Sequence, residues 1–155
     1  MQVNAKLSDI IEALEMQSEE SRHFLNVKTG EVVNVSSEAL LLAEEGEEYD
    51  HLPVWQHDEV KSAYDIVDNL EDYQDLPNRF DINEYHMMER FCYQQSEPKS
   101  QNQLLKAIQG KGAFRRFKDT AAYLGILDQW YDFKDACYKE IAIKFCEDLG
   151  VGWME

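Results

Sequence analysis

The sequence has no long apolar run. None of its hydrophobic segments approaches the roughly 18 apolar residues that a membrane span requires, so we expect no contact with a membrane. The N-terminal residues lack the succession of a basic and then an apolar stretch that is typical of a signal peptide, and we expect a cytoplasmic protein. Cysteines are also few. Three cysteines, far apart in the chain, exclude a disulfide framework.

Acidic residues are missing from one segment, residues 98–118, which carries six lysines and arginines. Residues 1–97 carry 6 bases and 23 acids, and residues 119–155 carry 3 bases and 8 acids. The net charge of −16 disfavours nucleic acid over most of the surface. We therefore expect the cationic segment to be either a site for an anion or a clasp for the protein's own carboxylates.

Length and composition predict one folded domain that covers residues 1–155. This length is sufficient to bury a core, and a hydrophobic content of 44% excludes general disorder. Apolar residues spaced by three and four positions predict helices over most of the chain. Residues 23–35 instead contain two runs rich in β-branched or bulky residues, on either side of Lys28-Thr29-Gly30. This pattern predicts a β-hairpin with glycine at positive φ. The expected fold class is α+β, predominantly helical, with a small N-terminal β-hairpin at about residues 23–35.

Capping signatures predict where helices begin. Ser36 or Ser37 is expected to cap the helix that follows the hairpin. Asp81 and Glu84 have the D-x-x-E spacing of a capping pair and are expected to start a later helix. Residues 73–77 are expected to form a short irregular or extended link.

The strongest candidate for a binding site is the segment 110–119, Gly-Lys-Gly-Ala-Phe-Arg-Arg-Phe-Lys-Asp. Glycines before a helix start let backbone N–H groups approach a ligand closely, and a helix N-terminus favours anions. We expect Phe114 and Phe117 to face the core, so that the bases point outward. Arginine side chains suit phosphate or carboxylate. The candidate anion-binding residues are Lys111, Gly112, Arg115, Arg116 and Lys118.

No motif in this segment identifies the anion. The spacing of a phosphate-binding Walker loop is absent, and Arg115 stands where a dinucleotide fingerprint needs its third glycine. Arg115 and Arg116 fit internal clasps to carboxylates such as Asp119 equally well. Both interpretations stay open at the level of the sequence.

Other residues predict no catalysis. His57 stands beside two acids, but without a second histidine or a cysteine pair at ligand spacing we expect neither a metal site nor a cofactor. The four histidines are expected at the surface or its rim. No serine, cysteine or threonine has a local nucleophile signature, so we expect a protein that is not an enzyme. The aromatic segment 128–133 is expected in the core rather than stacked on bases.

Four aspartates predict an acidic face on the third helical region and the link after it. They are Asp65, Asp68, Asp72 and Asp75. Such a face is typical of a solvated helix flank. A more specific interpretation is that these carboxylates bind a magnesium ion or a basic partner.

Two segments resemble a bacterial family, Uncharacterised Protein Family 0158. They are residues 80–89, Phe-Asp-Ile-Asn-Glu-Tyr-His-Met-Met-Glu, and residues 110–119. The pair Leu52-Pro53 with Trp55 and the segment 128–133 also match the pattern of that family. The resemblance covers most of the chain and implies a small cytosolic bacterial protein. It implies no activity and no catalytic residue.

Together these observations predict a non-enzymatic binding or regulatory protein. Its ligand is expected to be anionic and phosphate-bearing, with RNA the most economical choice and a nucleotide or an acidic protein fitting as well. Residues 110–118 would make the contacts. The alternative is an acidic interaction module for a basic protein, in which Arg115 and Arg116 are internal structural clasps. An unrecognised hydrolase or metal enzyme is the third hypothesis.

Overall fold

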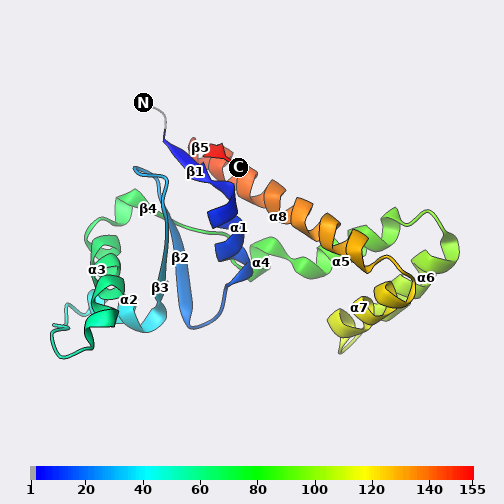
Figure 1. The fold of residues 1–155 in the computed structure, drawn as a ribbon, viewed down its shortest axis with the longest axis horizontal. Helices are drawn as coiled ribbons and strands as arrows, with labels where there is room; N and C mark the ends of the chain where they lie inside the picture. Colours follow the sequence, from blue (N-terminus) through cyan, green and yellow to red (C-terminus); the bar gives the residue numbers. More distant parts are fainter. Residues whose placement is uncertain (1–2) are drawn as a thin grey trace. The chain divides into compact units, whose positions relative to one another are not determined.

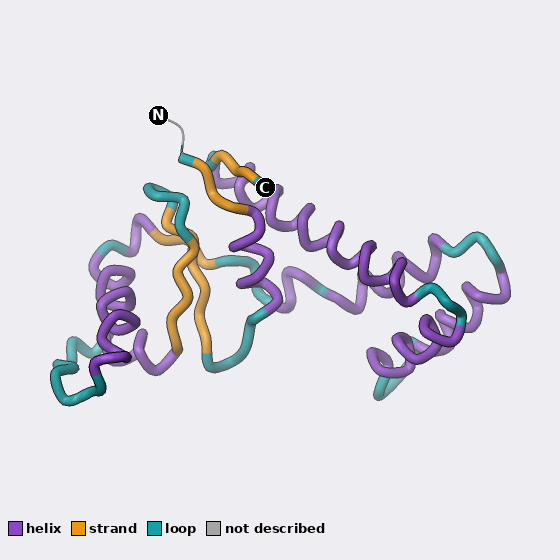
Figure 2. Tube along the Cα trace, viewed as in Figure 1, coloured by secondary structure: helices purple, strands orange, loops and turns teal. Residues whose placement is uncertain are grey.

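The computed structural model describes residues 3–155, most of which are helical (Figures 1 and 2). The chain divides into two compact units. Unit 1 consists of the residues up to Asn78 together with Ala142–Glu155, and unit 2 consists of Arg79–Ile141. The predicted class, α+β and predominantly helical, is confirmed. The expectation of one domain over the whole chain stays a prediction.

Unit 1 contains the strands of the part of the chain that the structure describes. Three of them form a sheet in the order β3-β2-β4, and the other two, β1 and β5, form a parallel pair. Its elements are β1 (Asn4–Lys6), α1 (Leu7–Glu15), β2 (Ser21–Asn26), β3 (Val32–Ser36), α2 (Ser37–Glu44), α3 (Val54–Asp68), the 3-10 helix η1 (Leu70–Asp72), β4 (Tyr73–Asp75) and β5 (Gly152–Met154).

Unit 2 is helical. Its elements are α4 (Arg79–Ile82), α5 (Glu84–Gln94), α6 (Pro98–Ala107), α7 (Ala113–Tyr123) and the first part of α8 (Leu127–Leu149), whose last turns belong to unit 1. Phe91, Phe117 and Trp130 pack edge to face, with the ring centroids of Phe117 and Trp130 4.8 Å apart. Trp130 has no solvent exposure. The predicted place of this residue in the core is therefore confirmed.

The predicted hairpin is confirmed. β2 and β3 are antiparallel and pair from Ser21 with Ser36 to Leu25 with Val32. Residues 73–75, expected to be part of a link, form β4 and add a third strand to the other edge of β2.

Backbone pairing holds β4 against β2, and two ion pairs join the same parts of the chain. Arg22 Nη2 lies 2.9 Å from Asp75 Oδ1, and Lys28 Nζ lies 3.3 Å from Asp72 Oδ1. Because these contacts join residues about fifty positions apart, the spacing of apolar residues gave no sign of the third strand.

The core of unit 1 lies where α2 and α3 cover one face of the sheet (Figure 1). Apolar residues at helical spacing on α3 meet the inward side chains of the strands, which removes both sets from water. The buried cluster comprises Phe24, Val35, Ala39, Leu40, Ala43, Val60, Ala63 and Ile66.

Two helix starts test the capping predictions. Ser36 caps α2, because its hydroxyl accepts a hydrogen bond from the Ala39 N–H at 3.1 Å, as expected. The pair Asp81 and Glu84 is wrong as a cap. Asn83 caps α5 instead, with a left-handed φ of 49° and its side-chain oxygen accepting from the His86 N–H. Asparagine tolerates this conformation better than most residues.

Lysines and arginines are unevenly divided between the two units. Unit 1 has 5 of them against 22 aspartates and glutamates, a net charge of −17. Unit 2 has 10 against 9, a net charge of +1. All of the excess acid therefore belongs to unit 1. Among residues 3–155, no helix has both the length and the apolar character to cross a bilayer.

Gly30 gives a direct test of the close packing of β1 against the hairpin. Its φ is +79°, and a Cβ placed on it would lie 2.5 Å from the backbone oxygen of Asn4 in β1. Gly30→Ala should therefore lower the free energy of unfolding by several kcal/mol, combining the left-handed cost of about 1–2 kcal/mol with a backbone clash. Urea unfolding followed by circular dichroism measures the loss.

Gly46→Ala is the matched control. Gly46 has a φ of +68°, but a Cβ there would meet nothing within 4 Å. The control should lose only the conformational cost of about 1–2 kcal/mol. Equal losses at the two positions would contradict the close approach of β1 to the hairpin.

Candidate functional site

The predicted site lies at the junction between α6 and α7, within unit 2. Gly110 and Gly112 have φ values of +77° and +76°, and Gly112 is the N-cap of α7. A Cβ on Gly112 would lie 3.1 Å from Arg116 Nη1, whereas one on Gly110 would meet nothing within 4 Å. The lack of a side chain at Gly112 therefore leaves room for the guanidinium group.

The guanidinium of Arg116 donates to three main-chain carbonyls. Nε donates to the Ala107 oxygen at 3.1 Å, Nη1 to Lys111 and Nη2 to Gln109. The end of a helix leaves carbonyl groups without intrahelical partners, and Arg116 satisfies one at the end of α6 and two in the turn that follows. The sequence suggested a ligand or the protein's own carboxylates as partners of Arg116. Its partners within the protein are main-chain carbonyls rather than carboxylates.

Arg115 lies in a different environment. Its side chain is 91% exposed, and its Nε lies 3.9 Å from Asp119 Oδ2 one helical turn later. Such exposed pairs contribute little free energy. The guanidinium of Arg115 can therefore turn to an external anion without loss of a strong internal contact.

Two lysines complete an exposed cationic group at the start of α7. Lys111 lies in the turn and Lys118 on the helix, and both are exposed. We call Lys111, Arg115 and Lys118 the cationic group. The first N–H groups of α7 lack intrahelical partners, as at any helix start, and Gly112 has no side chain to cap them.

The two phenylalanines of this segment differ in burial. Phe114 is 47% exposed, so the prediction that it faces the core is wrong, whereas Phe117 is fully buried as predicted.

An open hollow is lined by residues of α6 and α7, none of which belongs to the cationic group. Its volume is about 510 Å³, and Lys106, Arg116, Thr120 and Tyr123 contribute to its lining. Tyr123 is 85% exposed, which leaves its ring free to stack on another ring. Sequence analysis missed this tyrosine, although it stands one turn beyond Asp119 on the same helix.

The predicted acidic face is partly used inside the fold. Asp65 accepts hydrogen bonds from the Tyr73 hydroxyl and from Asn69, while Asp72 and Asp75 form ion pairs with Lys28 and Arg22. Burial and the bond to Asp65 raise the pKa of Tyr73.

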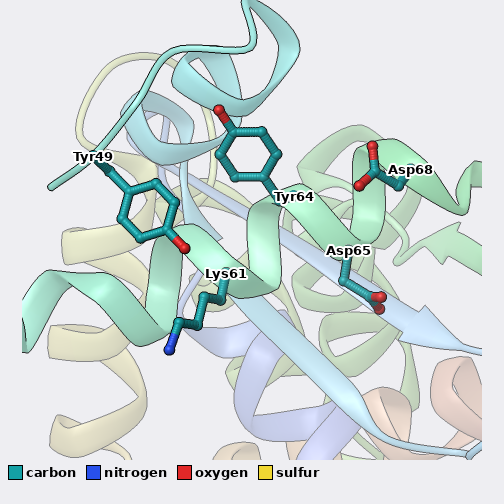
Figure 3. Close-up of a pocket in the computed structure, with 5 residues that line it drawn as sticks. All are labelled: Tyr49, Lys61, Tyr64, Asp65 and Asp68. Atoms are coloured by element: carbon teal, nitrogen blue, oxygen red, sulfur yellow. The ribbon is translucent and has the colours of Figure 1, made fainter.

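Figure 3 shows the shallow pocket at this face, with Lys61 pointing away from the carboxylates of Asp65 and Asp68. Lys61 therefore does not neutralise these two carboxylates across the pocket.

Residues 3–155 contain no cluster of three histidine, cysteine or acidic side chains placed to hold a metal ion. His23, expected near the surface, is only 7% exposed and forms hydrogen bonds with Asn34 and Ser21.

Burial raises the pKa of the Cys92 thiol to about 11. Because the thiolate is the reactive form, this cysteine is a poor nucleophile at neutral pH.

One known protein family matches nearly the whole chain. The model of an uncharacterised protein family, UPF0158, matches residues 3–151, so the chain belongs to that family. Searches of curated proteins and of solved structures find no match.

The two neighbouring arginines give a contrast that can be measured. Arg116→Ala should lower the free energy of unfolding by about 2 kcal/mol, because three carbonyls lose a charged donor. Arg115→Ala should change it by less than about 0.5 kcal/mol. Denaturant unfolding of both variants provides the comparison, and a loss at Arg115 as large as that at Arg116 would contradict these assignments.

Proposed function

We propose that this member of UPF0158 is a non-enzymatic binding protein that engages a phosphate-bearing ligand at the start of α7. The supporting observation is that Lys111, in the turn before α7, and Arg115 and Lys118, in its first two turns, are all exposed. A helix N-terminus favours anions through its free N–H groups and its dipole. In this proposal Arg116 keeps the turn in shape, and its engaged guanidinium makes no direct ligand contact.

Single-stranded RNA is the ligand that we propose, and the bacterial cytoplasm is the compartment. Phosphates would meet the cationic group, and a base would stack on the exposed ring of Tyr123. Three basic contacts give a modest affinity that depends on salt. A nucleotide offers the same phosphate and base on a smaller scale.

A second candidate function is an interaction module for a basic protein. The charge of unit 1 favours it, since residues 37–75 contain 13 acids and one base, Lys61. The engagement of Arg116 with its own backbone also fits this function, because it leaves one base fewer for an anion. Acidic surfaces of this density attract basic partners over a distance set by the salt concentration.

The first function predicts RNA binding that depends on the cationic group. The triple variant Lys111→Ala/Arg115→Ala/Lys118→Ala should bind a fluorescein-labelled 12-nucleotide RNA at least tenfold more weakly than the natural protein, because each lost base removes a phosphate contact. Fluorescence anisotropy at low salt measures the affinity. Circular dichroism should show that the variant remains folded.

The control is a triple variant with the same net charge, Lys6→Ala/Lys61→Ala/Lys144→Ala, in unit 1. It should retain the affinity of the natural protein if the contacts are local to the start of α7. Equal weakening in both variants would mean that only the net charge matters. Absence of RNA binding by the natural protein at low salt would contradict the first function outright.

The second function predicts binding of a basic peptide without large apolar residues. A labelled 12-residue peptide of alternating lysine and serine should bind the natural protein at low salt, and binding should weaken as salt screens the acids of unit 1. The same anisotropy measurement applies. A peptide that fails to bind even at low salt would contradict this function.

A further inference from the structure

The start of α3 exposes two large apolar side chains. Val54 is 81% and Trp55 is 76% exposed to solvent. They occupy the first turn, directly after Pro53, which is the N-cap of the helix. Tryptophan is usually well buried in folded proteins, and exposed tryptophans are enriched at the centres of binding interfaces.

Trp55 borders a hollow of about 260 Å³ that lies within unit 1, between α2 and α3. Ala39, Leu42, Leu52 and Val60 contribute its apolar lining, and the two leucines also pack against the core of unit 1. Sites for small molecules occupy about 300–1,000 Å³. The size and apolar lining of this hollow therefore suit one large side chain better than a cofactor.

Carboxylates stand at the same hollow. Glu38 and Glu59 both contribute to its lining. Glu59 accepts a hydrogen bond from the Ser36 N–H, which fixes its position, while Glu38 is exposed. Neither carboxylate forms an ion pair within residues 3–155.

The loop between α2 and α3 is held in place by aromatic contacts. The ring centroid of Tyr49 lies 5.2 Å from that of His57 and 5.9 Å from that of Tyr64. The hydroxyl of Tyr64 donates to the Glu47 carbonyl, and His57 Nε2 lies 3.0 Å from the Leu52 carbonyl. A surface that is already ordered has less conformational entropy to lose when a partner binds.

We infer that this hollow receives a phenylalanine or leucine side chain from a basic segment of a partner protein. The apolar side chain packs on Trp55 and Leu42, and flanking lysines or arginines approach Glu38 and Glu59. Charge complementarity identifies the partner, because the surrounding segment 37–75 contains 13 acids and a single base. The inference rests on the second proposed function and names the place and chemistry of its contact.

The test compares the lysine-serine peptide with a second peptide that has phenylalanine at one central position. The natural protein should bind the phenylalanine peptide about tenfold more tightly, which corresponds to about 1.4 kcal/mol. Trp55→Ala should remove this gain and leave the affinity for the lysine-serine peptide nearly unchanged. Trp55→Phe should keep most of the gain, because it preserves an aromatic surface.

Phe80→Ala in unit 2 is the matched control, since Phe80 is 92% exposed and lies outside the hollow. It should leave the tenfold gain intact. A gain that is absent, or that persists in Trp55→Ala, would overturn the docking site while the second function stands. Failure of both peptides to bind the natural protein at low salt would overturn the docking site and the second function together.

A second readout follows the tryptophan itself. Emission from Trp55 should shift to shorter wavelength when the phenylalanine peptide binds the natural protein, because the ring leaves water. This shift should be missing in Trp55→Phe, although that variant still binds. A shift of equal size in Trp55→Phe would place the contact elsewhere and overturn the docking site.

Discussion

The apolar cluster between the sheet and the α2–α3 pair has to hold together a unit in which 22 acids face 5 bases. Repulsion among like charges opposes any compact state. Two of the few bases of unit 1 lie at the sheet, where Arg22 and Lys28 pair with Asp75 and Asp72 of the segment that forms η1 and β4. Lys144 is paired with Asp148 on α8. The α2–α3 layer is left with Lys61, so its acids remain available to an external positive charge.

Unit 2 is nearly neutral, and its Arg116 is held by main-chain groups rather than by an acid. Main-chain carbonyls occupy its donors, but they are dipoles and do not cancel its charge. A carboxylate partner would have cancelled it. The positive potential at the start of α7 therefore includes Arg116 even though its hydrogen bonds are directed inward. The two neighbouring arginines therefore have different roles. Arg116 bonds to the main chain of its own turn, whereas Arg115 is exposed to solvent.

Local chemistry was predictable from the sequence, and long-range pairing was not. The hairpin with Gly30 at positive φ and the cap at Ser36 follow from residues close together in the chain. The β1–β5 pair and the addition of β4 depend on partners far away. Asn83 and Arg116 satisfy backbone groups in ways that a spacing rule does not register, and Phe114 followed the apolar period yet remained half exposed.

The charge of the whole chain also affects how salt should act at the cationic group. Three contacts to single-stranded RNA give a slope of about −2 in a plot of log affinity against log salt. The net charge of −16 repels the same RNA over roughly 30 Å at 0.01 M salt but over only about 8 Å at physiological ionic strength. Added salt thus weakens the contacts and relieves the repulsion at the same time. The slope for this protein should therefore be shallower than three contacts alone would give, and shallower than for an excised basic peptide with the same three residues.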